Sequence, residues 1–165
     1  HQRYALHKLM QHRAASASLP ELLSWMSKLS TMDNENSAFS ETHLYFELLN
    51  PLLPSPSVEL SHLIEEAKAL RQTHDFPQTR IILTLAHLRN QAPDQALVAL
   101  GNPEDWRMWQ GSRPAWAFLC AQTLRLNHDS EKAFVITENI DFTKMDRAEG
   151  ESLRKLFPGQ FPLEK

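Results

Sequence analysis

The feature of this sequence that most constrains its fold is an internal repeat with a spacing of 37 residues. One copy, PQTRIILTLAHLRNQAPDQALVALGN, begins at Pro77, and the other, PAWAFLCAQTLRLNHDSEKAFVITEN, begins at Pro114. Each copy predicts a long helix, a short polar break and a shorter second helix. Repetition at such a spacing is typical of stacked helical arrays. The aligned pairs include Pro77 and Pro114, Asn90 and Asn127, Ala96 and Ala133, Leu97 and Phe134, and Val98 and Val135.

The rest of the chain also predicts helices, so we expect an all-α fold. Apolar residues recur with a helical period, and no stretch shows the sustained alternation of a strand. Glycine is scarce, at 4 of 165 residues, and the ten prolines fall between the periodic runs, where they punctuate helices. Residues 30–39 are predicted to be a loop. The predicted helices cover about residues 18–29, 40–50, 55–73, 77–90, 93–100, 114–126, 129–138 and 143–157, with a short turn at 102–109.

Residues 114–136 resemble a tetratricopeptide repeat. Trp116, Leu119 and the small Cys120 match the first three positions of that motif, and Ala133 matches a later one, while Thr123 replaces the usual Tyr. A second match uses a different frame, in which residues 77–90 become a second helix instead of a first. That frame places Ala67, the turn His74-Asp75-Phe76, Leu83 and Ala86 on motif positions.

The resemblance implies a right-handed α-solenoid of antiparallel helix pairs over about residues 53–140. The Pro-rich connector 51–57 separates this array from N-terminal helices in residues 1–52, which could belong to the same solenoid. Residues 141–165 are expected to form a C-terminal capping helix and tail, because terminal repeats need a polar outer face. An irregular helical bundle is the alternative fold.

The first 14 residues are basic. They contain Arg3, Lys8 and Arg13 but no acid, which leaves 14 bases against 20 acids in the remainder. Such a segment could lie beside a membrane, with a spanning helix upstream in a longer protein. The alternative is a solvated helix that happens to be basic.

The motifs of common enzymes and metal sites are missing from the sequence. There is no phosphate-binding loop, no His-Glu-x-x-His pair and no Ser nucleophile elbow, and no two of the eight histidines are spaced as a helical metal pair. Glu65 and Glu66 are adjacent, so their carboxylates diverge on a helix. The single cysteine, Cys120, lies on an apolar stripe and is expected in the core. We therefore expect no enzyme activity, no cofactor, no metal and no nucleic-acid binding.

If the solenoid prediction holds, its concave groove is the expected partner site. In the frame of residues 113–136, the groove positions are Ala117, Ala121, Leu124 and Arg125, and the 37-residue shift adds Arg80, Thr84, His87 and Leu88. Arg80, His87 and Arg125 would favour an acidic peptide or a terminal carboxylate. In the other frame these residues leave the groove.

A second candidate surface is the stretch EDWRMWQG. Trp106, Arg107 and Trp109 are residue types enriched at interface hot spots. The alternative is that the two tryptophans anchor a short turn onto the core.

The sequence thus predicts a protein-interaction module, a scaffold or adaptor that binds a peptide or a partner helix of unknown identity. The alternative function is a structural or oligomerisation domain of a larger protein, which includes a membrane-anchored one. The absence of a possible disulfide favours a cytoplasmic location over a periplasmic or membrane-associated one.

Overall fold

A computed structural model describes residues 8–9, 12–13, 15–30 and 37–161 of the chain. Throughout these ranges the regular secondary structure is helical and contains no strand, which confirms the predicted all-α class. The predicted basic segment 1–14 lies outside the described residues, except for four residues that are helical and exposed. Residues 31–36 of the predicted loop 30–39 also lie outside the described residues.

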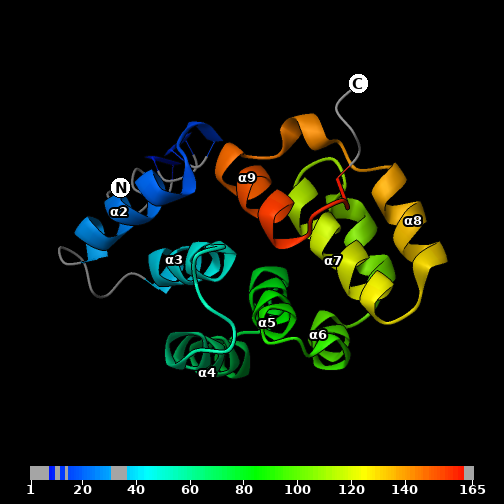
Figure 1. The fold of residues 1–165 in the computed structure, drawn as a ribbon, viewed down its shortest axis with the longest axis horizontal. Coiled ribbons are helices and arrows are strands. Elements are labelled where there is room, and N and C mark those ends of the chain that lie inside the picture. The colour runs from blue at the N-terminus through cyan, green and yellow to red at the C-terminus, as the bar shows by residue number, and fades with distance from the viewer. Residues whose placement is uncertain (1–7, 10–11, 14, 31–36, 162–165) are drawn as a thin grey trace. The chain divides into compact units, whose positions relative to one another are not determined.

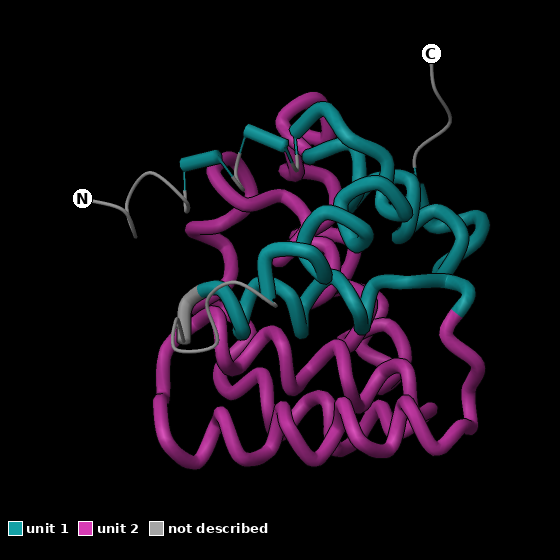
Figure 2. Tube along the Cα trace, turned by 90° about the vertical axis from the view of Figure 1, so that its left-hand side faces the viewer, with its two compact units in different colours: residues 1–52, 146–165 teal, residues 53–145 magenta. Residues whose placement is uncertain are grey.

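The chain forms two compact units (Figure 2). Unit 1 combines residues 1–52 with residues 146–165, and unit 2 is the continuous stretch 53–145. Unit 1 contains α2 (Leu19–Ser30), α3 (Ser37–Leu49) and α9 (Arg147–Leu156). Unit 2 contains α4 (Val58–Thr73), α5 (Pro77–Arg89), α6 (Pro93–Leu100), the 3₁₀ helix η1 (Pro103–Trp109), α7 (Pro114–Leu126), α8 (Ser130–Glu138) and the 3₁₀ helix η2 (Phe142–Lys144).

In unit 1 each of the three helices packs against the other two. The backbone N–H of Ser18 donates to Glu21 at 3.0 Å, which is one half of a capping box at the start of α2. Between α3 and α9 the buried hydroxyl of Tyr45 donates to the carboxylate of Glu149 at 2.6 Å. This bond joins residues that are 104 positions apart, so it ties the last helix to the N-terminal ones.

Unit 2 is built from helices that pack against their neighbours in the chain (Figure 1). The helix α5 packs on both α4 and α6, and α7 packs on α8. The second half of the unit joins the first because α7 also contacts α5, α6 and η1. Two of these contacts, of α5 with α6 and of α7 with α8, join pairs of helices that are equivalent in the 37-residue repeat.

The central helix of unit 2 is α7, which is buried along nearly its whole length. Every residue from Pro114 to Leu124 is buried. A helix that is apolar all round must be enclosed by other elements, because no side of it can face water favourably. Its small residues let neighbouring helices approach closely, and these are Ala115, Ala117, Cys120 and Ala121.

The repeat extends to the backbone turns that end the two long helices. Gln91 and His128, which are 37 residues apart, both have positive φ angles, of 56° and 65°. In the first turn Gln91 N–H donates to Leu88 O and Ala92 N–H donates to His87 O, and the second turn has the equivalent bonds. This is the Schellman pattern that normally uses glycine at the left-handed position. Without a glycine, the sequence predicted a break here but not this geometry.

Several predicted helix starts need correction. The helix α3 begins at Ser37, earlier than the predicted start at residue 40. The helix α4 begins at Val58, later than the predicted start at residue 55, and the hydroxyl of Ser57 accepts the N–H of Leu60 there. The last helix, α9, begins at Arg147 and not at the predicted residue 143, because Thr143 lies in η2. The predicted starts at Asn102 and Asp129 are confirmed as the residues that precede η1 and α8.

Because these turns contain a residue with positive φ, we expect a glycine substituted at that position to stabilise the protein. We expect His128→Gly to raise the free energy of unfolding by roughly 0.5–1 kcal/mol, because glycine adopts positive φ without the steric cost that histidine pays. Urea denaturation followed by circular dichroism measures this change. Asn90→Gly is the control, since Asn90 has a negative φ of −85° and should gain nothing. Equal or lower stability of His128→Gly would contradict the assignment.

Candidate functional site

The groove positions predicted from the sequence do not all reach the surface. Thr84 is fully buried, and His87 has an exposed fraction of 6%. The hydroxyl of Thr84 donates to the carbonyl of Arg80 within the same helix, so its polar group is already used. The repeat register carried a signal for this burial, because the residues aligned with Thr84 and His87 are the apolar Ala121 and Leu124. Neither side chain is accessible to a partner in this conformation.

Arg80 is partly exposed, but it is engaged within unit 2. Its guanidinium donates to the carboxylate of Asp75 at 2.6 and 3.1 Å, and these bonds hold the pKa of Asp75 below its ordinary value. The same guanidinium lies against Gly101, where an added Cβ would come within 2.8 Å of it. Gly101 also has a positive φ of 77°. Arg80 is therefore held at Asp75 and lies close to Gly101 at the end of α6.

Arg125 is the predicted groove cation that remains partly available. Its Nε and Nη2 atoms donate to Oε1 of Gln122 at 3.0 and 2.8 Å. Gln122 is itself buried, so it fixes the direction of the guanidinium. Arg125 makes no ion pair with any residue that the structure describes. Its remaining N–H groups could hold a carboxylate of a partner.

His87 carries a buried polar atom, Nδ1, that has no hydrogen-bond partner among the described residues. His87 belongs to α5, which packs on α4 and α6. Burial lowers the pKa of His87; Lys68 on α4 lowers it further, and Asp94 on α6 opposes the shift. Burial disfavours the charged imidazolium, so His87 is neutral at neutral pH.

The tryptophans of η1 form an aromatic cluster with Trp116 of α7. Trp106 is 2% exposed and its indole N–H donates to Leu100 O at 3.1 Å. Both tryptophans meet the ring of Trp116 edge-on, with ring centroids 6.4 Å away for Trp106 and 5.1 Å away for Trp109. The guanidinium of Arg113 lies 4.3 Å from the centre of the Trp116 ring. This geometry supports the anchoring interpretation for Trp106.

The outer side of η1 is the part of this turn that a partner could reach. Arg107 and Met108 are exposed, and Trp109 is half-buried. Arg107 is paired with Glu104 through a 3.0 Å contact, so its charge is partly neutralised. Of the three residues singled out in this stretch, Arg107 and Trp109 thus remain candidates for contact.

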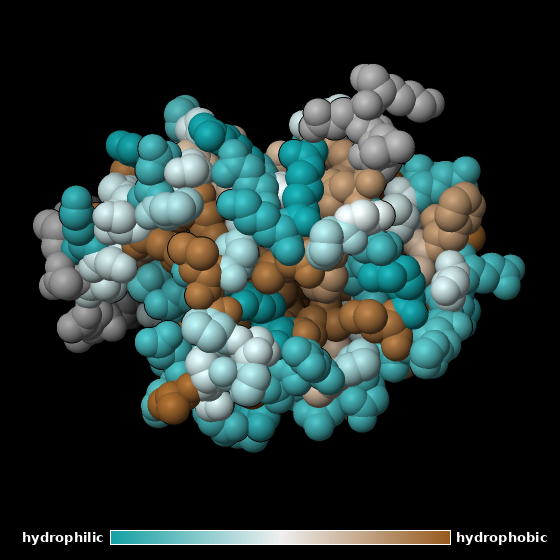
Figure 3. All heavy atoms as spheres, viewed as in Figure 1, coloured by the Kyte–Doolittle hydropathy of each residue, from teal (hydrophilic) through white to brown (hydrophobic). Residues whose placement is uncertain are grey.

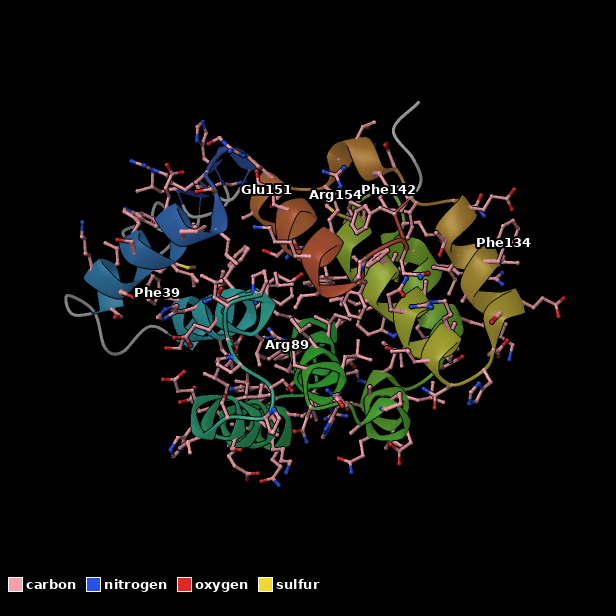
Figure 4. All side chains as sticks on the ribbon, viewed as in Figure 1. Phe39, Arg89, Phe134, Phe142, Glu151 and Arg154 are labelled. Atoms are coloured by element: carbon pink, nitrogen blue, oxygen red, sulfur yellow. The ribbon has the colours of Figure 1, made fainter. Side chains whose placement is uncertain are left out.

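Arg89 is a buried charged residue that the sequence analysis did not single out. Its Nη2 atom donates to Leu53 O at 2.6 Å, and its carbonyl accepts the hydroxyl of Ser55. Burial lowers the pKa of Arg89, although the group stays charged. Figure 4 shows Arg89 on α5. Arg89 holds the connector before α4, and only the tertiary fold brings it to that connector.

Unit 1 contains a cleft of about 400 Å³ beside α2. The guanidinium of Arg13 lies 5.8 Å from the centre of the Trp25 ring at this cleft. Glu21 also lines it, and the hydrogen bond from Ser18 lowers the pKa of that carboxyl. The cleft is lined by Arg13, Ser16, Ala17, Glu21, Leu22 and Trp25. Both of its charged groups thus have contacts within the unit.

A search of the described residues finds no group of three or more side chains able to hold a metal ion. In the same residues no helix has the length and apolar character needed to span a bilayer. Burial, with a smaller contribution from Glu104, raises the pKa of the Cys120 thiol to about 12. The thiolate is the nucleophilic form, so Cys120 is chemically inert in the folded protein.

The burial of His87 predicts a pH dependence of stability. Folded His87 binds its proton less tightly than the unfolded chain, whose histidine pKa is 6.5. The stability that it contributes above this pH is therefore lost as the pH falls toward the folded pKa. His87→Leu, which copies the residue at the aligned position 124, should reduce the loss. Urea unfolding at about pH 7.5 and 5.5 compares the two proteins, and an equal loss in both would contradict the prediction.

The burial of Cys120 predicts slow labelling by a thiol reagent. At about pH 8, a thiol with a pKa of about 12 has roughly a 1000-fold smaller thiolate fraction than one at the ordinary value of 9.0. We expect the native protein to react with Ellman's reagent only as fast as it unfolds. The urea-denatured chain, as the control, should react at once. Complete labelling of the native protein on the same timescale as the denatured chain would refute this.

Comparisons with known proteins give no relative for this chain. No family model matches the sequence, no curated protein is significantly similar to it, and no solved structure matches significantly. The candidate surfaces of the two units must therefore be interpreted from their own chemistry.

Proposed function

We propose that this chain is a protein-interaction module, a scaffold or adaptor rather than an enzyme. The observation that carries the proposal is the repeated helical hairpin of unit 2. Helices α5 and α7 have equal lengths, end in the same left-handed turn and lead into second helices that start 37 residues apart. Arrays of such hairpins present extended surfaces, and binding of peptides or partner helices is their usual use.

We further infer that α4 to α8 form a short right-handed solenoid of the tetratricopeptide type. Packing of α5 on α6 and of α7 on α8 supports the frame in which each repeat begins at a proline. This frame makes α5 and α7 the first helices, and Arg125 then lies near the end of the groove. Arg125 and the exposed side of η1 are the candidate contact residues that remain accessible.

Affinity capture from a lysate of the source organism, with mass spectrometry, tests the proposal. Arg125→Glu is the informative variant, because Arg125 is partly exposed and has no ion pair among the described residues. We expect it to fold normally and to recover a groove partner roughly tenfold less well, since a close charge pair becomes a repulsive one. Lys155→Glu on α9, at an exposed residue of unit 1, is the control for a change of charge alone.

The outcomes separate three interpretations. Loss of the partner with Arg125→Glu alone would support binding at the groove. Equal recovery of a partner by the native chain and both variants would support the interaction function but would show that the partner binds at another surface. Recovery of no protein other than the chain itself would refute the adaptor function and favour a structural or oligomerisation domain.

A further inference from the structure

One face of α8 exposes apolar side chains between two carboxylates. Glu131, Phe134, Val135 and Glu138 follow the spacing i, i+3, i+4 and i+7, so they form one stripe along the helix. Phe134 is 65% exposed and Val135 is 37% exposed. Figure 4 shows Phe134 on the side of α8 that faces away from α7, and Figure 3 shows apolar residues on the surface there.

The first three of these positions have counterparts on α6, one repeat earlier, while the position equivalent to Glu138 is Gly101. Asp94 aligns with Glu131, Leu97 with Phe134 and Val98 with Val135. Val98 is 83% exposed, which makes it the most exposed of the large apolar side chains in the described residues. Single exposed apolar residues are ordinary on protein surfaces. The repeat therefore carries an acid followed by two apolar residues on both second helices, although Leu97 is half-buried where Phe134 is exposed.

The charge around these stripes is negative. Asp94, Glu131 and Glu138 form no ion pair within the described ranges of the chain, in contrast to five other acids of unit 2, which are Glu65, Asp75, Glu104, Asp129 and Asp141. The single base of α8, Lys132, is paired with Asp129 at 2.9 Å, and α6 has no base. A positively charged partner would therefore meet unpaired carboxylates beside exposed apolar side chains.

We propose that the stripe on α8 is a docking surface for a basic amphipathic helix of a partner protein. The inference rests on the proposed interaction function and adds to the groove at Arg125 a second contact surface with its own class of partner. Apolar residues of the incoming helix would cover Phe134 and Val135. Its Lys or Arg residues would pair with Glu131 and Glu138, which adds specificity and accelerates association.

Charge decides against other occupants of this surface. An anionic membrane surface or a nucleic acid would be repelled by the carboxylates. A second copy of the chain, docked stripe to stripe, would place acids opposite acids. A basic helix satisfies both the apolar and the charged parts of the surface.

The test uses the full chain and two synthetic peptides in fluorescence anisotropy. Both peptides carry Leu at helical i, i+3, i+4 and i+7 positions, and the remaining positions are Lys in one and Glu in the other. We expect the Lys peptide alone to bind, with an affinity that falls as salt is added. Phe134→Ala should weaken binding roughly tenfold, because it removes most of the apolar contact. Glu131→Gln with Glu138→Gln should weaken it roughly fivefold, as expected for two exposed charge pairs.

A matched control is available on α4. Glu59 and Glu66 are exposed and have the same seven-residue spacing as Glu131 and Glu138. Changing both to Gln removes the same charge from another helix and should leave binding unchanged. Equal weakening by the two double variants would show unspecific attraction and overturn the proposal.

Three further results would also overturn it. These are no binding of the Lys peptide, equal binding of the Glu peptide, and dimerisation of the native chain that Phe134→Ala abolishes. The proposed function would survive the first two if affinity capture still recovered a partner. The proposed function itself would fail only if affinity capture recovered no partner. The two failures can therefore be distinguished, because they come from different experiments.

Discussion

The structure of unit 2 depends on the burial of α7. This helix has no polar face, and its eleven residues from Pro114 to Leu124 are all buried. Such a helix is stable only if other elements enclose it, because the exposure of any side would lose the hydrophobic stabilisation. Helices α5, α6 and α8 and the turn η1 contact it. The small side chains of α7 allow the close packing, and the tryptophans of η1 fill the space beside Trp116.

The second helices of unit 2 expose apolar side chains outside the proposed groove. Helices α6 and α8 are short and bury only narrow stripes, Ala96, Ala99 and Leu100 on one and Ala133 and Ile136 on the other. Both helices follow a turn of the same Schellman geometry, and Val98 and Phe134 are exposed on them. The fold thus leaves open on α8 the surface at which we propose that a partner helix binds.

The arginines of unit 2 divide into those that the fold uses and those that it leaves available. Arg80 binds Asp75 and covers Gly101, and Arg89 holds the carbonyl of Leu53. Arg113 lies over an aromatic ring, while Arg125 is oriented by the buried Gln122 and has donors left over. Charge in the sequence therefore does not indicate by itself which cations can meet a partner.

The sequence by itself determined the all-α class, the positions of most helices and the register of the repeat, since helical periodicity and proline punctuation are local properties. It also placed Cys120 in the core, because its neighbours are apolar with a helical period. Only the tertiary structure decided that Trp106 is buried and that Val98 and Phe134 are exposed. Each of these residues lies in a short helix whose buried side depends on which other helices pack against it. Such contacts join residues far apart in the chain, and no local pattern contains them.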